Sequence, residues 1–60
     1  MNLKTEVYFR NHRWWFAVLE LGRLGQTLER LISRPCRNRR DAHKQAVQAL
    51  ALERTRRNAA

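Results

Sequence analysis

Few side chains in this sequence could take part in covalent chemistry. The candidates are the single cysteine, Cys36, and the two histidines, His12 and His43. A nucleophilic thiol needs a base within hydrogen-bonding reach, and the separation of seven positions between Cys36 and His43 is not typical of such a pair. The five carboxylates are scattered, and no glycine motif for cradling phosphate is present. We therefore expect a protein that is not an enzyme and has no metal or cofactor.

Arginine dominates the charge of the chain. Thirteen Lys and Arg residues, eleven of them Arg, stand against five Asp and Glu residues, so the net charge is +8. Guanidinium groups bind phosphate and carboxylate in bidentate geometry. A charge this high favours nucleic acid or an acidic protein surface as the partner, and the alternative is a solvated basic surface without a partner.

The basic residues form two clusters along the second half of the chain. The first surrounds the expected start of a helix and contains Arg34, Arg37, Arg39, Arg40 and Lys44. The second lies near the end of that helix and contains Arg54, Arg56 and Arg57. Cations near a helix C-terminus also complement its dipole, which is a structural explanation for the second cluster. Basic side chains beside the free amides of a helix start predict an anion site, so the first cluster is our candidate contact for nucleic acid or an acidic partner.

Both tryptophans lie in one short apolar run, from Arg13 to Leu21. Read with a period of two, this run is apolar on both sides, and a strand of that kind needs cover on both faces. One helix covers one face only. We therefore expect the other face to stack on bases, to form a homodimer, or to bind a partner protein, unless it is half-covered surface. The candidate stacking or interface residues are Trp14, Trp15 and Tyr8.

Alternating apolar and polar residues predict the first strand, from Leu3 to Arg10, and the apolar run predicts the second, from Trp14 to Leu21. Gln26 to Ser33 is expected to form a third strand. Leucine spacing also allows a helix from Glu20 to Arg34, which two glycines within it disfavour. Ser33 to Arg37 is expected to be a linker, because proline disfavours helical geometry before it.

A helix is expected from Asp41 to about Arg56, with Asn38 accepting a hydrogen bond from a first-turn amide. Its narrow apolar face consists of small residues that let it lie close to a sheet, namely Ala42, Ala46, Ala49 and Leu50, with Val47 at the edge. The predicted fold is α+β, a single domain over residues 1–60 in which a C-terminal helix covers one face of a three-stranded antiparallel sheet (βββα).

This outline resembles two known families. Four features carry the resemblance: a tryptophan-rich second strand, the turn from Gly22 to Gly25, a set of residues around the helix start, and an alanine-rich helix. The residues around the helix start are Ser33, Arg37, Arg39, Asp41 and Ala42. In this order they resemble the small YegP-like βββα module. They are also similar to the arm-binding domain of tyrosine recombinases, and that resemblance implies a sheet laid into DNA.

The leading hypothesis is a small basic binding protein, encoded by a phage or mobile element, that engages nucleic acid through its arginine clusters. The alternative is a phage-encoded inhibitor of a host protein or defence complex, similar to an anti-CRISPR protein, that acts by protein–protein contact. No run approaches the roughly 18 apolar residues of a membrane span, and the first residues have no signal-peptide pattern. We therefore expect a cytoplasmic protein without a membrane partner.

Overall fold

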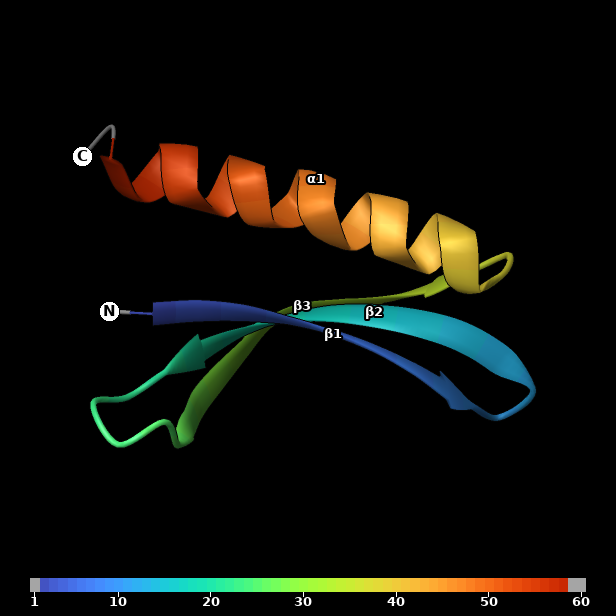
Figure 1. Ribbon diagram of the computed structural model, residues 1–60, viewed down its shortest axis with the longest axis horizontal. Coiled ribbons are helices and arrows are strands. Elements are labelled where there is room, and N and C mark those ends of the chain that lie inside the picture. Colours follow the sequence, from blue (N-terminus) through green and yellow to red (C-terminus); the bar gives the residue numbers. More distant parts are fainter. Residues whose placement is uncertain (1, 59–60) are drawn as a thin grey trace.

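The computed structural model describes residues 2–58 and has the predicted βββα order. The strands are β1 (Asn2–Arg10), β2 (Arg13–Leu21) and β3 (Thr27–Cys36), and the helix is α1 (Arg39–Asn58). The strands form one antiparallel sheet in the order β1-β2-β3, and α1 packs on one face of it (Figure 1). The prediction of a three-stranded sheet covered by one helix is confirmed, and the alternative helix from Glu20 to Arg34 is wrong.

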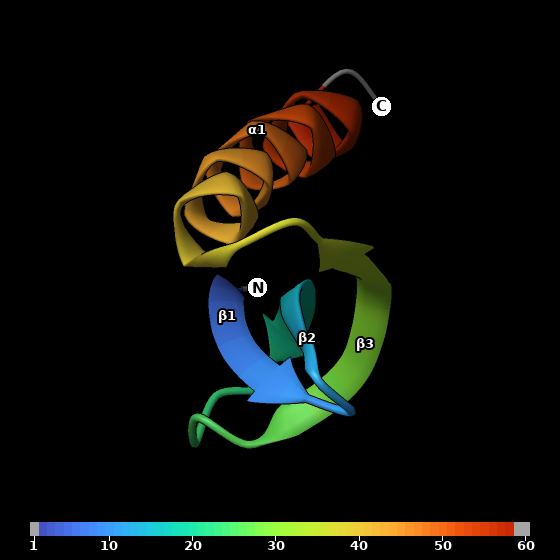
Figure 2. The ribbon, with the colours of Figure 1, turned by 90° about the vertical axis from the view of Figure 1, so that its right-hand side faces the viewer.

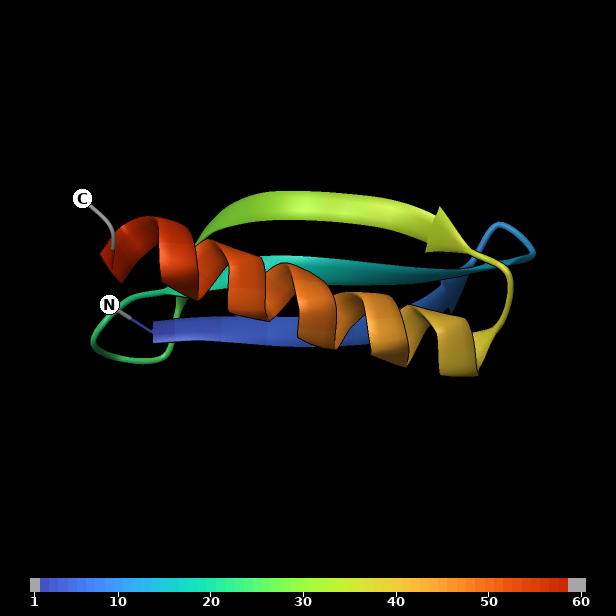
Figure 3. The same cartoon turned by 90° about the horizontal axis from the view of Figure 1, so that it is seen from above.

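The core lies between α1 and the middle of β2. Phe16, Ala42 and Ala46 are buried together, and the two alanines let the helix backbone approach the sheet closely, as their spacing predicts. The side chains packed around them are Val7, Trp14, Ile32, Cys36 and Ala49. Viewed from above, α1 lies over β1 and β2 and leaves β3 largely uncovered (Figure 3). Val47, expected at the edge of the apolar face, is 67% exposed.

The face of β2 that points away from α1 is less exposed to solvent than its sequence predicts. Ala17 and Leu19 point away from α1, yet only 0% and 5% of their surface is exposed. Their register partners on the edge strands include the long side chains Lys4, Glu6 and Arg30. The sheet twists strongly along its length (Figure 2), and two register shifts in the β2–β3 pair add to that twist. The homodimer therefore stays a prediction, and the apolar area that this face offers to a second subunit is smaller than expected.

β3 runs further than the sequence predicts, through the segment that was expected to be a linker. Pro35 is the register partner of Trp15, and Cys36 that of Trp14. β3 is an edge strand, and an edge strand can accept proline because one side of its backbone has no neighbour to bond. The expectation of a linker from Ser33 to Arg37 is therefore wrong for residues 33–36, which belong to β3.

The β1–β2 hairpin turns through two residues that both adopt left-handed geometry. Asn11 has a φ of 53° and His12 a φ of 62°, and Arg10 pairs with Arg13 across the turn. Two positive φ values are typical of a type I′ turn, in which Asn-Gly is the preferred sequence. Both side chains have a Cβ, so both residues carry a steric cost in this geometry that glycine would avoid.

We expect His12→Gly to raise the free energy of unfolding by about 0.5–1 kcal/mol. Removing the Cβ relieves a left-handed cost of roughly 1–2 kcal/mol, and the greater freedom of glycine in the unfolded chain offsets part of the gain. Urea denaturation followed by circular dichroism measures the change. His12→Ala, which keeps the Cβ, should bring no such gain, and a His12→Gly variant less stable than wild type would contradict this account.

Candidate nucleic-acid interface

The antiparallel order of the strands brings the β1–β2 turn and the start of α1 to the same end of the molecule (Figure 1). The pairing of Trp14 with Cys36 fixes this arrangement. We call residues 10–13 and 34–44 together the basic end. It contains the whole first cluster expected from the sequence, and two arginines of the hairpin join it.

The basic end concentrates positive charge that the fold leaves unpaired. Seven of the thirteen Lys and Arg residues lie in it against one of the five acidic residues, Asp41. The seven are Arg10, Arg13, Arg34, Arg37, Arg39, Arg40 and Lys44. Within residues 2–58 every salt bridge involves Glu20 or Glu53, at the other end of the fold, and none involves these seven. Their charges therefore remain available to a partner.

The start of α1 is held by side-chain capping, as expected. The Asp41 amide donates to Asn38 Oδ1 at 2.8 Å. The Asp41 carboxylate accepts a hydrogen bond from Gln45 Nε2 at 2.8 Å and a longer one from the Arg37 amide at 3.4 Å. This carboxylate already complements the positive end of the helix dipole. An anion at this end would consequently be held by the guanidinium groups more than by the helix amides.

The structure distributes the members of the first cluster around this helix start. Arg37, Arg40 and Lys44 line one shallow depression together with Asn38 and Asp41. Arg39 and Arg34 are exposed beside it, in α1 and β3 respectively, with Arg34 paired to Phe16. The cluster is therefore a surface around the helix start and not an enclosed site.

The two tryptophans lie on opposite faces of the sheet. Trp14 is on the covered face, where it packs against the core and meets Phe9 at 5.3 Å between ring centroids, tilted by 59°. Trp15 is on the open face and stacks on Tyr8, with centroids 6.4 Å apart and planes within 5°. Its Nε1 donates to the carbonyl oxygen of Arg10 at 2.9 Å, and the Tyr8 hydroxyl lies 3.0 Å from Ser33 Oγ. Of the candidate aromatic residues, Tyr8 and Trp15 thus form a pair on the open face, whereas Trp14 pairs with Phe9 on the covered face.

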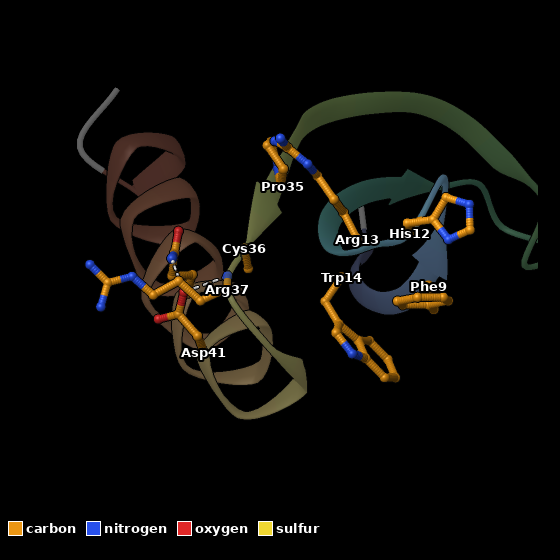
Figure 4. A pocket seen from close by; sticks show the side chains of 9 residues that line it. Phe9, His12, Arg13, Trp14, Pro35, Cys36, Arg37 and Asp41 are labelled. Carbon is orange, nitrogen blue, oxygen red and sulfur yellow. Dashed lines mark hydrogen bonds between the residues drawn. The ribbon is translucent and has the colours of Figure 1, made fainter.

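A cleft at the basic end separates the hairpin from the helix start (Figure 4). Phe9, His12, Arg13 and Trp14 form one wall, and Arg37, Asp41 and Gln45 the other, with Pro35 and Cys36 between them. Sequence reasoning missed Phe9, Arg10 and Arg13 as site residues. A signal was present, because in an antiparallel meander the first turn always meets the end of the third strand.

Two of the three arginines of the second cluster, Arg56 and Arg57, form ion pairs with acidic residues. Arg57 lies 2.9 Å from Glu20 of β2 and 3.5 Å from Glu53, one turn earlier in α1. Arg56 lies 3.5 Å from the same Glu53. The Arg57–Glu20 pair ties the last turn of α1 to the sheet, and all three pairs neutralise part of the charge there. This end is therefore a weaker candidate for an anionic partner.

Cys36 lies in the cleft with a thiol that should react slowly. Partial burial, together with the charge of Asp41, raises the pKa of Cys36 above its ordinary value of 9.0. Its Sγ also contacts the carbonyl oxygen of Arg34 at 3.8 Å. Because only the thiolate is nucleophilic, the raised pKa lowers reactivity at neutral pH.

We expect the alkylation rate of Cys36 to rise with pH along a profile displaced to higher pH than that of the urea-unfolded chain. The same displacement links pH to stability: the favourable contribution of the thiol is complete below 9.0 and is lost as pH rises through the folded-state pKa. Iodoacetamide labelling followed by mass spectrometry gives both profiles. A folded profile that overlies the unfolded one, or lies below it in pH, would contradict this assignment.

Within residues 2–58, no group of three or more His, Cys, Asp or Glu side chains could hold a metal ion. In that same part of the chain, no helix combines the length and the apolar character needed to cross a membrane. The resemblance to YegP-like modules and arm-binding domains stays a prediction. No protein-family model, no curated protein and no solved structure matches this chain.

Proposed function

We propose that this protein is a non-enzymatic nucleic-acid-binding module and that the basic end is its binding surface. The observation that carries the proposal is the group of seven cationic side chains at the basic end. They have one acidic neighbour, and none of them takes part in a salt bridge with any residue from 2 to 58. Folding gathers these charges from three strands, the connection between β3 and α1, and the helix, although unpaired like charges repel one another. A polyanionic partner relieves that repulsion.

Phosphate contacts supply the affinity in this proposal. Arginine binds phosphate oxygens through two parallel N–H donors, and six of the seven cations are arginines. Each phosphate that the protein neutralises releases condensed counterions from the nucleic acid, so the affinity depends steeply on salt. The concentration of charge at one end also steers the partner toward that end during association.

Fluorescence anisotropy with labelled DNA and RNA, single-stranded and duplex, tests the proposal across salt concentrations. We expect log Kobs to fall against log[salt] with a slope of roughly −4.5 to −6.3 on duplex DNA, for about five to seven phosphate contacts. No detectable binding at about 50 mM salt, or binding whose slope is near zero, would refute the proposal.

The exposed leucines of the β2–β3 hairpin favour a second candidate function, protein binding, which includes the inhibitor of a host protein or defence complex. Leu24 is 91% exposed and Leu28 54% exposed, and this hairpin curves away from α1 (Figure 1). Two exposed leucines on one hairpin offer apolar area that a partner protein could cover. A pull-down from nuclease-treated lysate tests it: wild type should retain one stoichiometric protein that Leu24→Ser loses, and equal recovery with both would argue against it.

A further inference from the structure

The cleft between the β1–β2 hairpin and the start of α1 has the composition of a site for a flat aromatic ligand. We propose that it holds one unpaired base of a single-stranded nucleic acid whose phosphates lie on the surrounding arginines. The proposal rests on the function proposed above, and it names the form of nucleic acid that the basic end prefers.

The apolar wall of the cleft is aromatic and accessible. Phe9 is 58% exposed, although its register partner Trp14 packs against the core on the covered face of the sheet. Its ring leans on Trp14, which the core holds in place. In Figure 4 Phe9 and Trp14 stand across the cleft from Arg37 and Asp41, with Cys36 between the two groups. A rigid pair of rings presents a preformed surface on which a base can stack.

The opposite wall offers polar groups that can meet the edge of a base. Asp41 Oδ2 accepts bonds within the helix start, whereas among residues 2–58 no hydrogen bond engages Asp41 Oδ1 or Gln45 Oε1. Both oxygens are acceptors suited to the N–H donors on the edge of a base, such as the ring N3–H of thymine or the exocyclic amino groups of the other bases. The cleft volume of about 610 Å³ falls in the range of small-ligand sites, roughly 300–1,000 Å³.

Charge decides between a base and an aromatic side chain of a protein as the occupant. Arg13 and Arg37 line the cleft, and the other cations of the basic end lie around it, so the charge of the surroundings favours a ligand with anionic groups on either side of its flat portion. A nucleotide in a strand has that form. A paired base in a duplex does not, because both of its faces are already stacked.

The first experiment compares three probes of equal length: a single-stranded oligothymidine, the same backbone with abasic sites, and a duplex. We expect wild type to bind the oligothymidine about 5- to 150-fold more tightly than the abasic strand, the range typical of stacking one base. Phe9→Ala should abolish that difference and leave duplex affinity unchanged within about twofold, since its phosphate contacts remain.

Matched variants separate stacking from other effects of the substitution. Phe9→Tyr should restore the preference for bases, whereas Phe9→Leu, which keeps apolar bulk without a flat ring, should not. Leu52→Ala removes a side chain of comparable exposure from the outer face of α1, 67% against 58% for Phe9, and should leave all three affinities unchanged. Near-ultraviolet circular dichroism verifies that each variant is folded.

Cys36 supplies an independent footprint because it is the single cysteine and lies in the cleft. Saturating oligothymidine should slow alkylation of Cys36 several-fold, and saturating duplex should not. Equal binding of oligothymidine and abasic strand by wild type would overturn the base site while leaving the proposed function intact. Binding of no probe would overturn both. Protection of Cys36 by polyglutamate, an acidic polypeptide, but not by oligothymidine would overturn the base site in favour of a protein ligand.

Discussion

Replacing Arg37, Arg39 and Arg40 together with glutamine is expected to weaken duplex DNA binding roughly 100- to 500-fold at about 0.1 M salt. Each lost phosphate contact lowers the salt slope by about 0.9, so three contacts lower it by about 2.7. At about 1 M salt the electrostatic attraction is largely screened, so the two proteins should bind with similar affinity. Lowering the salt tenfold from there, to about 0.1 M, turns a slope difference of about 2.7 into an affinity difference of up to about 500-fold. Anisotropy titrations of both proteins over a salt series measure affinity and slope together.

The matched control removes the same number of charges away from the basic end. Arg23, Arg54 and Arg56 are exposed and lie in the β2–β3 loop and the last turns of α1. Their triple glutamine variant has the same net charge as the first one, but we expect it to lose less than about fivefold in affinity, through long-range attraction alone. Equal losses in the two triple variants would show that overall charge, and not the basic end, determines binding.

Truncation of the central core residue should have the largest effect on stability. Phe16 is 2% exposed and packs between Ala42 and Ala46, so Phe16→Ala is expected to cost about 3–5 kcal/mol. A domain of 60 residues has a total stability of about 3–9 kcal/mol. The variant should therefore be largely unfolded at room temperature, or at best retain a low melting temperature.

Thermal unfolding followed by circular dichroism tests this expectation. Phe9→Ala serves as the control, because the same substitution at a 58% exposed position should cost less than about 1 kcal/mol. A Phe16→Ala variant that melts with wild-type cooperativity and midpoint would contradict the assignment of the core.

The fold follows from local patterns that the sequence shows directly. Period-two alternation and aromatic residues indicate β1 and β2, and Asn38 indicates the start of α1 where its side chain indeed accepts the Asp41 amide. The small face that contains Ala42 and Ala46 is buried against β2 as its spacing predicts. The length of β3 was not predictable from the same rules, because Pro35 disfavours a strand everywhere except at an edge.

Local patterns in the sequence predict only the helical half of the candidate site. Adjacent cations at the start of α1 are visible in the sequence, whereas Arg13 and Phe9 join them through strand register, which follows from the complete meander. The cover of Ala17 and Leu19 on the second face depends on sheet twist and on side chains of the edge strands. Neither effect has a local pattern, so the apolar area left for a second subunit was overestimated.

Chemical-shift mapping by NMR tests the central claim most directly, because it locates the ligand on the folded, unmodified chain. On addition of oligothymidine at low salt, the largest perturbations are expected in Phe9 to Trp14 and Cys36 to Gln45, with the Trp14 indole signal moving more than that of Trp15. Changes centred on the β2–β3 hairpin, or spread evenly over the sheet and α1, would contradict the basic end as the nucleic-acid interface.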